Sequence, residues 1–132
     1  MSNPQQTHGA FSWCELQTSD PQKATAFYVD VLGWETEQMA MPMGDYTLLK
    51  AGGQPVGGVM QQPDGPTQWA SYVTVDDVDA SVTRAIAKGA TLIAEAMDVP
   101  GVGRMAGFID PFGATLWVIT YESVSKQKAE AA

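Results

Sequence analysis

One carboxylate in the first alternating stretch of the chain could carry chemistry. Residues alternate there with the period of a strand, which places Glu15 on the same face as Trp13 and Gln17. Burial in an apolar cavity would favour the protonated form of this carboxyl group, so Glu15 is a candidate general base or an anchor for a cationic ligand. A salt bridge to Lys50 or Arg104 is the alternative role.

The sequence has one histidine and one cysteine, which limits the metal and redox sites that it can form. His8 is the one histidine of the chain, and because it precedes the first predicted strand we expect it to be solvated. Cys14 is the one cysteine, which excludes an internal disulfide, a CxxC pair and a cysteine-based zinc site. We expect Cys14 to be a small buried hydrophobic residue. A two-histidine-one-carboxylate iron site cannot form in a chain with one histidine.

Charge and hydropathy exclude two classes of partner. The formal net charge is -8, which repels the phosphates of nucleic acids. Residues 1–10 lack the basic and apolar regions of a secretion signal, and no apolar run is long enough to span a bilayer. We therefore expect a cytoplasmic protein with no nucleic-acid partner and no membrane partner.

Two similar modules position the candidate residues. Residues 11–34 are echoed by residues 68–90, because in each stretch an alternating strand leads to an acidic helix cap, an amphipathic helix and a glycine. The apolar stripe of the first helix consists of Ala24, Phe27, Tyr28, Val31 and Leu32. The expected buried stripe of the second helix consists of Val78, Val82, Ala85 and Ile86.

Three further strands follow each predicted helix, so each module reads βαβββ. They cover residues 34–40, 46–50 and 55–61 in the first module and residues 91–95, 104–109 and 115–121 in the second. The fold class is therefore α+β. We expect a single domain over residues 10–122, made of module one (10–62) and module two (68–122), between a flexible N-terminus (1–9) and a flexible tail (123–132).

The chain resembles the vicinal oxygen chelate superfamily over residues 10–121. The resemblance rests on the two consecutive βαβββ modules, on the pattern DP…FYxxxLGW ending at Trp34, and on the sequence DPFG before the last strand. The superfamily includes glyoxalase I, bleomycin-resistance proteins, extradiol dioxygenases and methylmalonyl-CoA epimerase. The resemblance implies that two half-cups of sheet close around a ligand cavity, within one chain or across chains. It also implies that two copies of the chain pair as a twofold homodimer with a small-molecule ligand as partner.

The resemblance also implies where a metal would bind, because metal enzymes of the superfamily carry ligands on the first and last strands of each module. Those positions fall on Trp13, Gly57, Ala70 and Trp117. None of them offers the nitrogen or carboxylate oxygen that a divalent ion needs. We therefore expect a site without metal or cofactor, in which Gly57 and Ala70 leave room for a ligand.

Aromatic side chains replace the metal ligands in this reading. Trp13 and Trp117 would line the cavity, and strand alternation would point Tyr72 and Tyr121 the same way. Aromatic walls hold flat or cationic ligands by stacking and cation–π attraction, worth about 0.5–2 kcal/mol per contact. The alternative is that the two tryptophans fill the space as a solid core.

Three hypotheses for function follow. The first is a protein similar to bleomycin-resistance proteins that binds a small aromatic, apolar or cationic compound in a metal-free cavity. The second is a metal-independent isomerase or lyase with Glu15 as base and Tyr72 or Tyr121 as acid. The third is an interaction protein whose cavity is filled. The residues expected to line the cavity are Trp13, Gln17, Gly57, Ala70, Tyr72, Trp117 and Tyr121.

Overall fold

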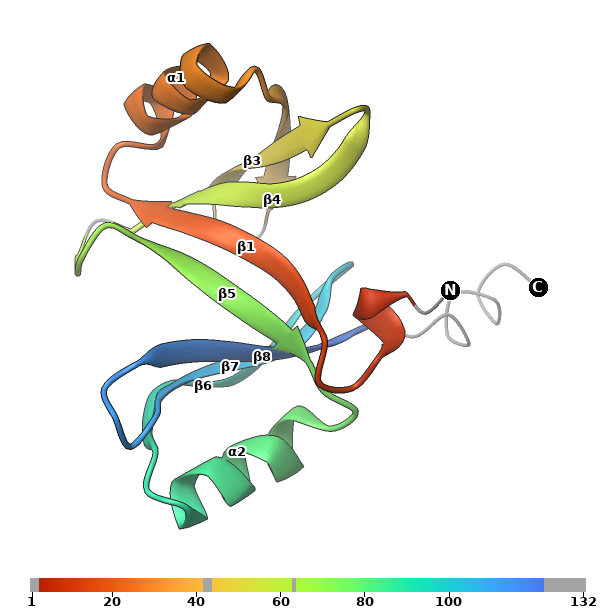
Figure 1. Ribbon diagram of the computed structural model, residues 1–132, viewed down its shortest axis with the longest axis vertical. Helices are drawn as coiled ribbons and strands as arrows, with labels where there is room; N and C mark the ends of the chain where they lie inside the picture. Colours follow the sequence, from red (N-terminus) through yellow and green to blue (C-terminus); the bar gives the residue numbers. More distant parts are fainter. Residues whose placement is uncertain (1–2, 42–43, 63, 123–132) are drawn as a thin grey trace. The chain divides into compact units, whose positions relative to one another are not determined.

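The computed structural model describes residues 3–41, 44–62 and 64–122, and within them it shows an α+β chain with two α-helices and eight strands (Figure 1). The described residues form two compact units. Unit 1 comprises the residues up to Ser12 together with those from Tyr72 onward, and unit 2 comprises Trp13–Ser71. The boundary between the units therefore crosses the first strand of each predicted module.

The order of elements confirms the two predicted βαβββ modules. The first module contains β1 (Phe11–Thr18), α1 (Pro21–Leu32), β2 (Glu35–Met41), β3 (Gly44–Ala51) and β4 (Gln54–Gln61). The second contains β5 (Gln68–Thr74), α2 (Val78–Ala87), β6 (Thr91–Val99), β7 (Gly103–Ile109) and β8 (Thr115–Tyr121). A short 3-10 helix, η1 (Pro4–Gln6), precedes β1.

Strand β6 is longer than the sequence pattern indicates. It continues to Val99, because its second half pairs with β7 through Met97 beside Met105 and Val99 beside Gly103. The glycine- and proline-rich stretch at residues 99–104 is therefore mostly a tight hairpin turn between two strands.

Unit 2 contains a small mixed sheet with strand order β2-β3-β4-β1. Strands β1 and β4 run parallel, while the β2–β3 and β3–β4 pairs are antiparallel. Its core consists of Leu16, Leu49 and Val59, against which Tyr28 and Trp34 pack. Helix α1 begins where the Asp20 carboxylate accepts a hydrogen bond from the Lys23 amide at 3.1 Å, and it ends at Gly33, whose φ of 73° is left-handed.

Unit 1 repeats this arrangement with strand order β5-β8-β7-β6. Strands β5 and β8 are parallel and β6, β7 and β8 are antiparallel neighbours. Its core consists of Val75, Val78, Ala106 and Val118. Residues before β1 contact this unit, since the Thr74 hydroxyl donates to the Pro4 carbonyl at 2.7 Å.

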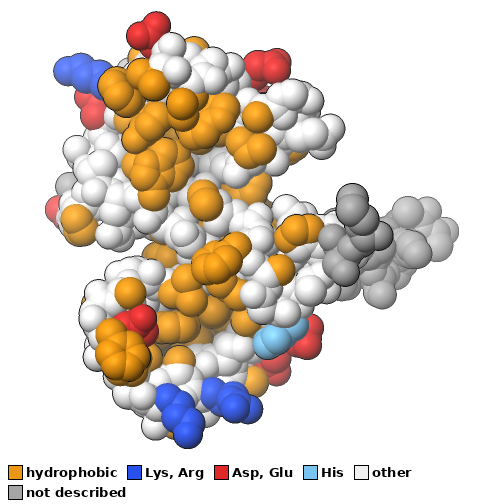
Figure 2. Space-filling view, in the orientation of Figure 1, with side chains coloured by type: hydrophobic (Ala, Val, Ile, Leu, Met, Phe, Trp, Pro, Cys, Tyr) orange, Lys and Arg blue, Asp and Glu red, His pale blue; other side chains and the backbone are white. Residues whose placement is uncertain are grey.

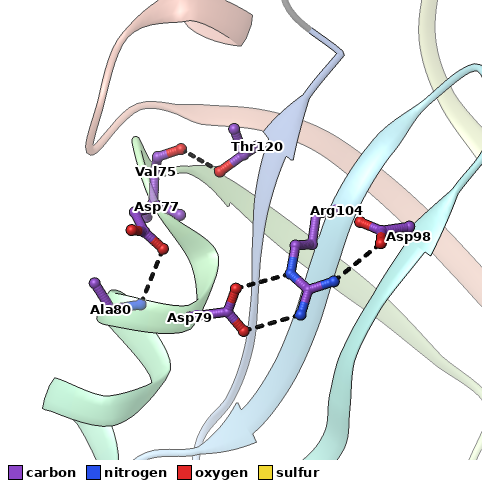
Figure 3. A network of polar contacts seen from close by, with 7 residues as sticks. All are labelled: Val75, Asp77, Asp79, Ala80, Asp98, Arg104 and Thr120. Carbon is purple, nitrogen blue, oxygen red and sulfur yellow. Dashed lines mark hydrogen bonds and ion pairs between the residues drawn. The ribbon is translucent and has the colours of Figure 1, made fainter.

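Arg104 joins helix α2 to two strands of unit 1 (Figure 3). Its guanidinium donates two hydrogen bonds to the Asp79 carboxylate, at 2.9 and 3.0 Å, and pairs with Asp98 at 3.1 Å. The hydrogen bond from Arg104 holds the pKa of Asp79 below its usual value. Asp77 accepts from the Ala80 amide at 3.1 Å and so caps α2. At the start of α2, Asp77 therefore caps the helix and Asp79 attaches it to the sheet.

Two expectations about burial are wrong. Cys14 is exposed, because within β1 only Glu15–Thr18 are buried, so that the core does not reach the cysteine. Ile86 is also exposed, so the buried stripe of α2 is narrower than its sequence pattern. Among the described residues, no helix is both long and apolar enough to cross a membrane.

Candidate functional site

Two amide side chains extend from Glu15 as a chain of hydrogen bonds in unit 2. The Gln17 amide donates to the Glu15 carboxylate at 3.4 Å, and the Gln68 amide donates to the Gln17 amide oxygen at 3.3 Å. Glu15 and Gln17 are both buried, as are Leu16 and Thr18 on the other face of β1. Lys50 pairs with Glu37, and Arg104 pairs with Asp79 and Asp98. A buried carboxylate that accepts a hydrogen bond from an amide can accept a proton or bind a cation.

The Trp13 side chain has a hydrogen-bond partner within unit 2. Its indole N–H donates to the Tyr46 hydroxyl at 2.9 Å. The Tyr46 ring in turn covers Gly58, where an added Cβ would overlap the ring and its hydroxyl. Strand β1 places Glu15 beside Gly58, so this contact lies next to the buried carboxylate. The sequence pattern did not indicate Tyr46 as a site residue, because pairing between strands brings it beside Trp13 and Gly58.

Gly57 and Ala70 are buried small residues of unit 2. A Cβ at Gly57 would lie 2.6 Å from the Cys14 carbonyl oxygen. The close approach of β1 and β4 therefore explains the glycine by itself, without a ligand above it.

Tyr72 and Trp117 lie together in unit 1. They face each other in the parallel register of β5 and β8, and their rings stack with centroids 5.5 Å apart and an interplanar angle of 28°. Gly107 on the neighbouring strand makes room for the indole, since a Cβ there would lie 3.0 Å from the Trp117 ring. The Trp117 indole nitrogen is buried and has no hydrogen-bond partner among the described residues. A buried N–H group without an acceptor is costly, by about 1–3 kcal/mol.

Tyr121 lies four residues farther along β8, where its hydroxyl and the Ser12 hydroxyl are 2.9 Å apart. Partial burial raises the pKa of Tyr121 above its usual value, and the Ser12 hydrogen bond opposes that shift. The phenol therefore stays protonated at neutral pH and can donate a proton or a hydrogen bond. Tyr72, Trp117 and Tyr121 belong to unit 1, whereas Trp13, Glu15, Gln17, Gly57 and Ala70 belong to unit 2.

The side chains at the four implied metal-ligand positions do not fit a divalent metal. Two are indoles, one of which already donates to Tyr46, and the other two are a glycine and a methyl group. Within the described part of the chain, no three His, Cys, Asp or Glu side chains gather as a ligand set. The expectation of a metal-free site stays a prediction that metal analysis tests.

A surface groove of about 680 Å³ runs along α2 in unit 1. Ser81, Arg84, Lys88 and His8 are among its lining residues, and none of the predicted site residues lines it. His8 has a structural contact there, because its Nδ1 accepts a hydrogen bond from the Asp76 amide at 2.9 Å.

Comparison with known proteins places the chain among glyoxalase-like proteins. Residues 13–119 match the model of the family described as the glyoxalase-like domain. A protein named "Putative glyoxylase CFP32" from Mycobacterium tuberculosis is 43% identical over 114 residues, which cover 84% of this chain and 44% of that protein. The anthracycline biosynthesis protein DnrV of Streptomyces peucetius is 33% identical over 127 residues, covering 83% of this chain and 46% of that protein. The chain thus spans about half the length of these relatives.

Solved structures show the same fold at low sequence identity. Methylmalonyl-CoA epimerase from Mycobacterium tuberculosis superposes with a TM-score of 0.60 at 20% identity, over 94% of this chain and 92% of the epimerase. A Mn(II)-bound glyoxalase from Novosphingobium aromaticivorans gives a TM-score of 0.57 at 23% identity, over 83% of this chain and 38% of that protein. The chain has the vicinal oxygen chelate fold and belongs to the family of glyoxalase-like domains.

Proposed function

We propose that this chain binds a small flat aromatic compound without a metal, and that Tyr72 and Trp117 of unit 1 hold it. The observation that carries the proposal is the Trp117 indole nitrogen, which is buried and lacks an acceptor among the described residues. An oxygen or ring nitrogen of a ligand would complete that hydrogen bond. We also propose that the protein is cytoplasmic and that it is similar in function to bleomycin-resistance proteins, as expected from the sequence.

Two contributions to the binding free energy favour an aromatic ligand. A ring added to the stacked pair of Tyr72 and Trp117 would gain about 0.5–1.5 kcal/mol from ring geometry beyond its buried area. An acceptor for the indole N–H would remove the penalty of the unpaired donor, which is about 1–3 kcal/mol. The net charge of -8 also attracts ligands that carry a cationic group.

The named relatives support this ligand class. The Streptomyces relative is named for anthracycline biosynthesis. Anthracyclines are flat polycyclic aromatic compounds with carbonyl oxygens, which match the stacking surface and the unpaired donor. We therefore choose an anthracycline as the first probe.

The binding test compares three variants by isothermal titration calorimetry with doxorubicin and a panel of planar aromatic carbonyl compounds. Trp117→Phe keeps a ring for stacking but removes the N–H, so affinity should fall about tenfold, the net worth of one hydrogen bond. Trp34→Phe is the matched control, because Trp34 packs on the core of unit 2, and it should bind as the wild type does. Equal affinity of Trp117→Phe and wild type would contradict the assignment, as would the absence of binding across the panel.

A second candidate function rests on Glu15. Its buried carboxylate accepts a hydrogen bond from Gln17, which suits a base that takes a proton from a carbon acid without a metal. The mycobacterial relative named a glyoxylase favours an isomerase or lyase of this kind. The test follows the hemithioacetal of methylglyoxal and glutathione with chelator-treated protein. If Glu15 is the base, Glu15→Gln should abolish turnover while calorimetric binding survives, and turnover retained by Glu15→Gln would exclude that role.

A further inference from the structure

We propose that the groove along α2 in unit 1 is a second ligand site, and that it binds the phosphate monoester of an apolar alcohol. The groove has a volume of about 680 Å³, which is within the size range of small-molecule sites. Neither Tyr72 nor Trp117 is among its lining residues, so this site is separate from the aromatic site proposed above. Figure 2 shows basic side chains on the part of unit 1 where α2 lies.

The groove contains two cations that the fold leaves unpaired. Arg84 and Lys88 are four residues apart at the end of α2, so their side chains lie on the same side of the helix. Lys23, Lys50 and Arg104 each pair with a carboxylate, whereas Arg84 and Lys88 have no ion-pair partner among the described residues. Like charges at this spacing repel each other, and a bound anion would remove that repulsion.

The helix dipole explains only part of this arrangement. Arg84 lies in the last turn of α2 and Lys88 is the C-cap residue, where positive charge interacts favourably with the negative end of the dipole. That interaction does not need a hollow in the surface. Ala80 and Ala85 also line the groove, and their short side chains leave space there for an apolar group. The two cations and the apolar space together match an anion with an uncharged body.

Two further hydrogen-bond donors line the groove. His8 Nδ1 accepts a hydrogen bond from the Asp76 amide at 2.9 Å, so the neutral imidazole carries its proton on Nε2. The Ser81 hydroxyl has no hydrogen-bond partner among the described residues and can donate as well. A phosphate monoester carries a charge of about −1.5 to −2 at neutral pH and has three strong acceptor oxygens. This charge and these acceptors match two cations and two neutral donors.

The acidic end of the groove sets the orientation of the ligand. Asp76 and Asp77 line the groove at the start of α2, where Asp77 also accepts a hydrogen bond from the Ala80 amide. Asp77 and Lys88 are eleven residues apart, which corresponds to about 16 Å along a helix. The phosphate therefore binds beside Arg84 and Lys88, and the uncharged body extends toward the start of α2. A second anionic group on the body would be repelled there.

NMR titration of the isotope-labelled full chain with cyclohexyl phosphate tests this site. The probe has no aromatic ring, so its result is independent of the doxorubicin titration that tests Tyr72 and Trp117. We expect saturable binding with a Kd on the order of 1 mM, as suits a ligand of this size. The largest shifts should occur at the backbone amides of Ser81, Arg84 and Lys88. Cyclohexanol, which lacks the phosphate, should bind at least about tenfold more weakly.

The charge test uses a double variant. Arg84→Gln with Lys88→Gln should weaken binding of cyclohexyl phosphate at least about 30-fold, because both charge-assisted contacts are lost. Both residues are exposed, so the circular dichroism spectrum should match that of the wild type. The matched control, Lys23→Gln with Lys50→Gln, removes the same charge from unit 2 and should bind within about twofold of the wild type.

The shape test is Ala80→Leu, which fills the groove and keeps both cations. It should weaken binding of cyclohexyl phosphate at least about fivefold, because the larger side chain occupies the space of the cyclohexyl ring. Unsaturable shifts with the wild type overturn the proposal, and so does equal weakening by the two double variants. Wild-type affinity of Ala80→Leu would show that the ring does not lie in the groove. Shifts centred on the Trp117 indole would place the anion at the aromatic site and refute a separate one.

Discussion

Replacing Gly58 by alanine should destabilise the protein through one neighbour, the Tyr46 ring. Gly58 lies inside strand β4 and does not have a positive φ, so the backbone itself accepts alanine. The new Cβ would overlap the Tyr46 hydroxyl and two carbons of its ring. The ring must therefore swing away, and it then loses the hydrogen bond that the Trp13 indole donates to it at 2.9 Å.

The expected cost combines two effects. Forcing an extra carbon into a filled space costs about 1–3 kcal/mol, and loss of the Trp13–Tyr46 hydrogen bond costs a further 0.5–1.5 kcal/mol or so. We therefore expect Gly58→Ala to lower the free energy of unfolding by about 2–4 kcal/mol. In a Tyr46→Ala background the clash is gone, and because alanine loses less backbone entropy than glycine in a strand, the same change should stabilise by about 0.5–1 kcal/mol.

Urea unfolding of the four proteins in this double-mutant cycle measures the coupling. Gly57→Ala is the matched control, because its Cβ would meet the Cys14 backbone carbonyl, which no side-chain deletion removes. That control should destabilise equally with and without Tyr46. If Gly58→Ala has the same effect in both backgrounds, the Tyr46 ring does not lie over Gly58 and the assignment of this contact fails.

Three further predictions concern unit 1. Trp117→Phe should change the free energy of unfolding by less than about 1.5 kcal/mol, because removal of the unpaired N–H group offsets the lost packing. Trp117→Ala should lower the free energy of unfolding by about 3 kcal/mol. Urea unfolding of both variants measures these changes. The pKa of Asp79 is lower in the folded protein than its ordinary value of 3.8, so the ionised carboxylate stabilises the fold at pH values above 3.8. This contribution is lost as the pH falls through the pKa of the folded state. The melting temperatures of the wild type and of Arg104→Gln should therefore converge in acid. The pKa of Tyr121 is higher in the folded protein than its ordinary value of 10.0, so the protonated phenol stabilises the fold at pH values below 10.0. This contribution is lost as the pH rises through the pKa of the folded state. Tyr121→Phe should therefore flatten the alkaline decline in melting temperature, and an unchanged decline would show that another group causes it.

The sequence alone determined the local elements and their order. Helix starts at Asp20 and Asp77 and the stop at Gly33 depend on capping side chains and on a left-handed backbone that glycine adopts without strain. The strand period likewise placed Glu15 and Gln17 on one face of β1. These features depend on neighbours close in the chain, so composition and spacing were sufficient to predict them.

Tertiary structure decided which side chains meet and which remain at the surface. Tyr46 reaches Trp13, and Gly107 makes room for Trp117, because of strand register between segments far apart in sequence. The exposure of Cys14 depends on where the core of unit 2 ends along β1. An apolar stripe indicates only that a helix face should be covered, and long-range packing decides which element covers it. Helix α1 therefore has an apolar stripe in sequence, although its Phe27 and Val31 side chains are exposed in the structure.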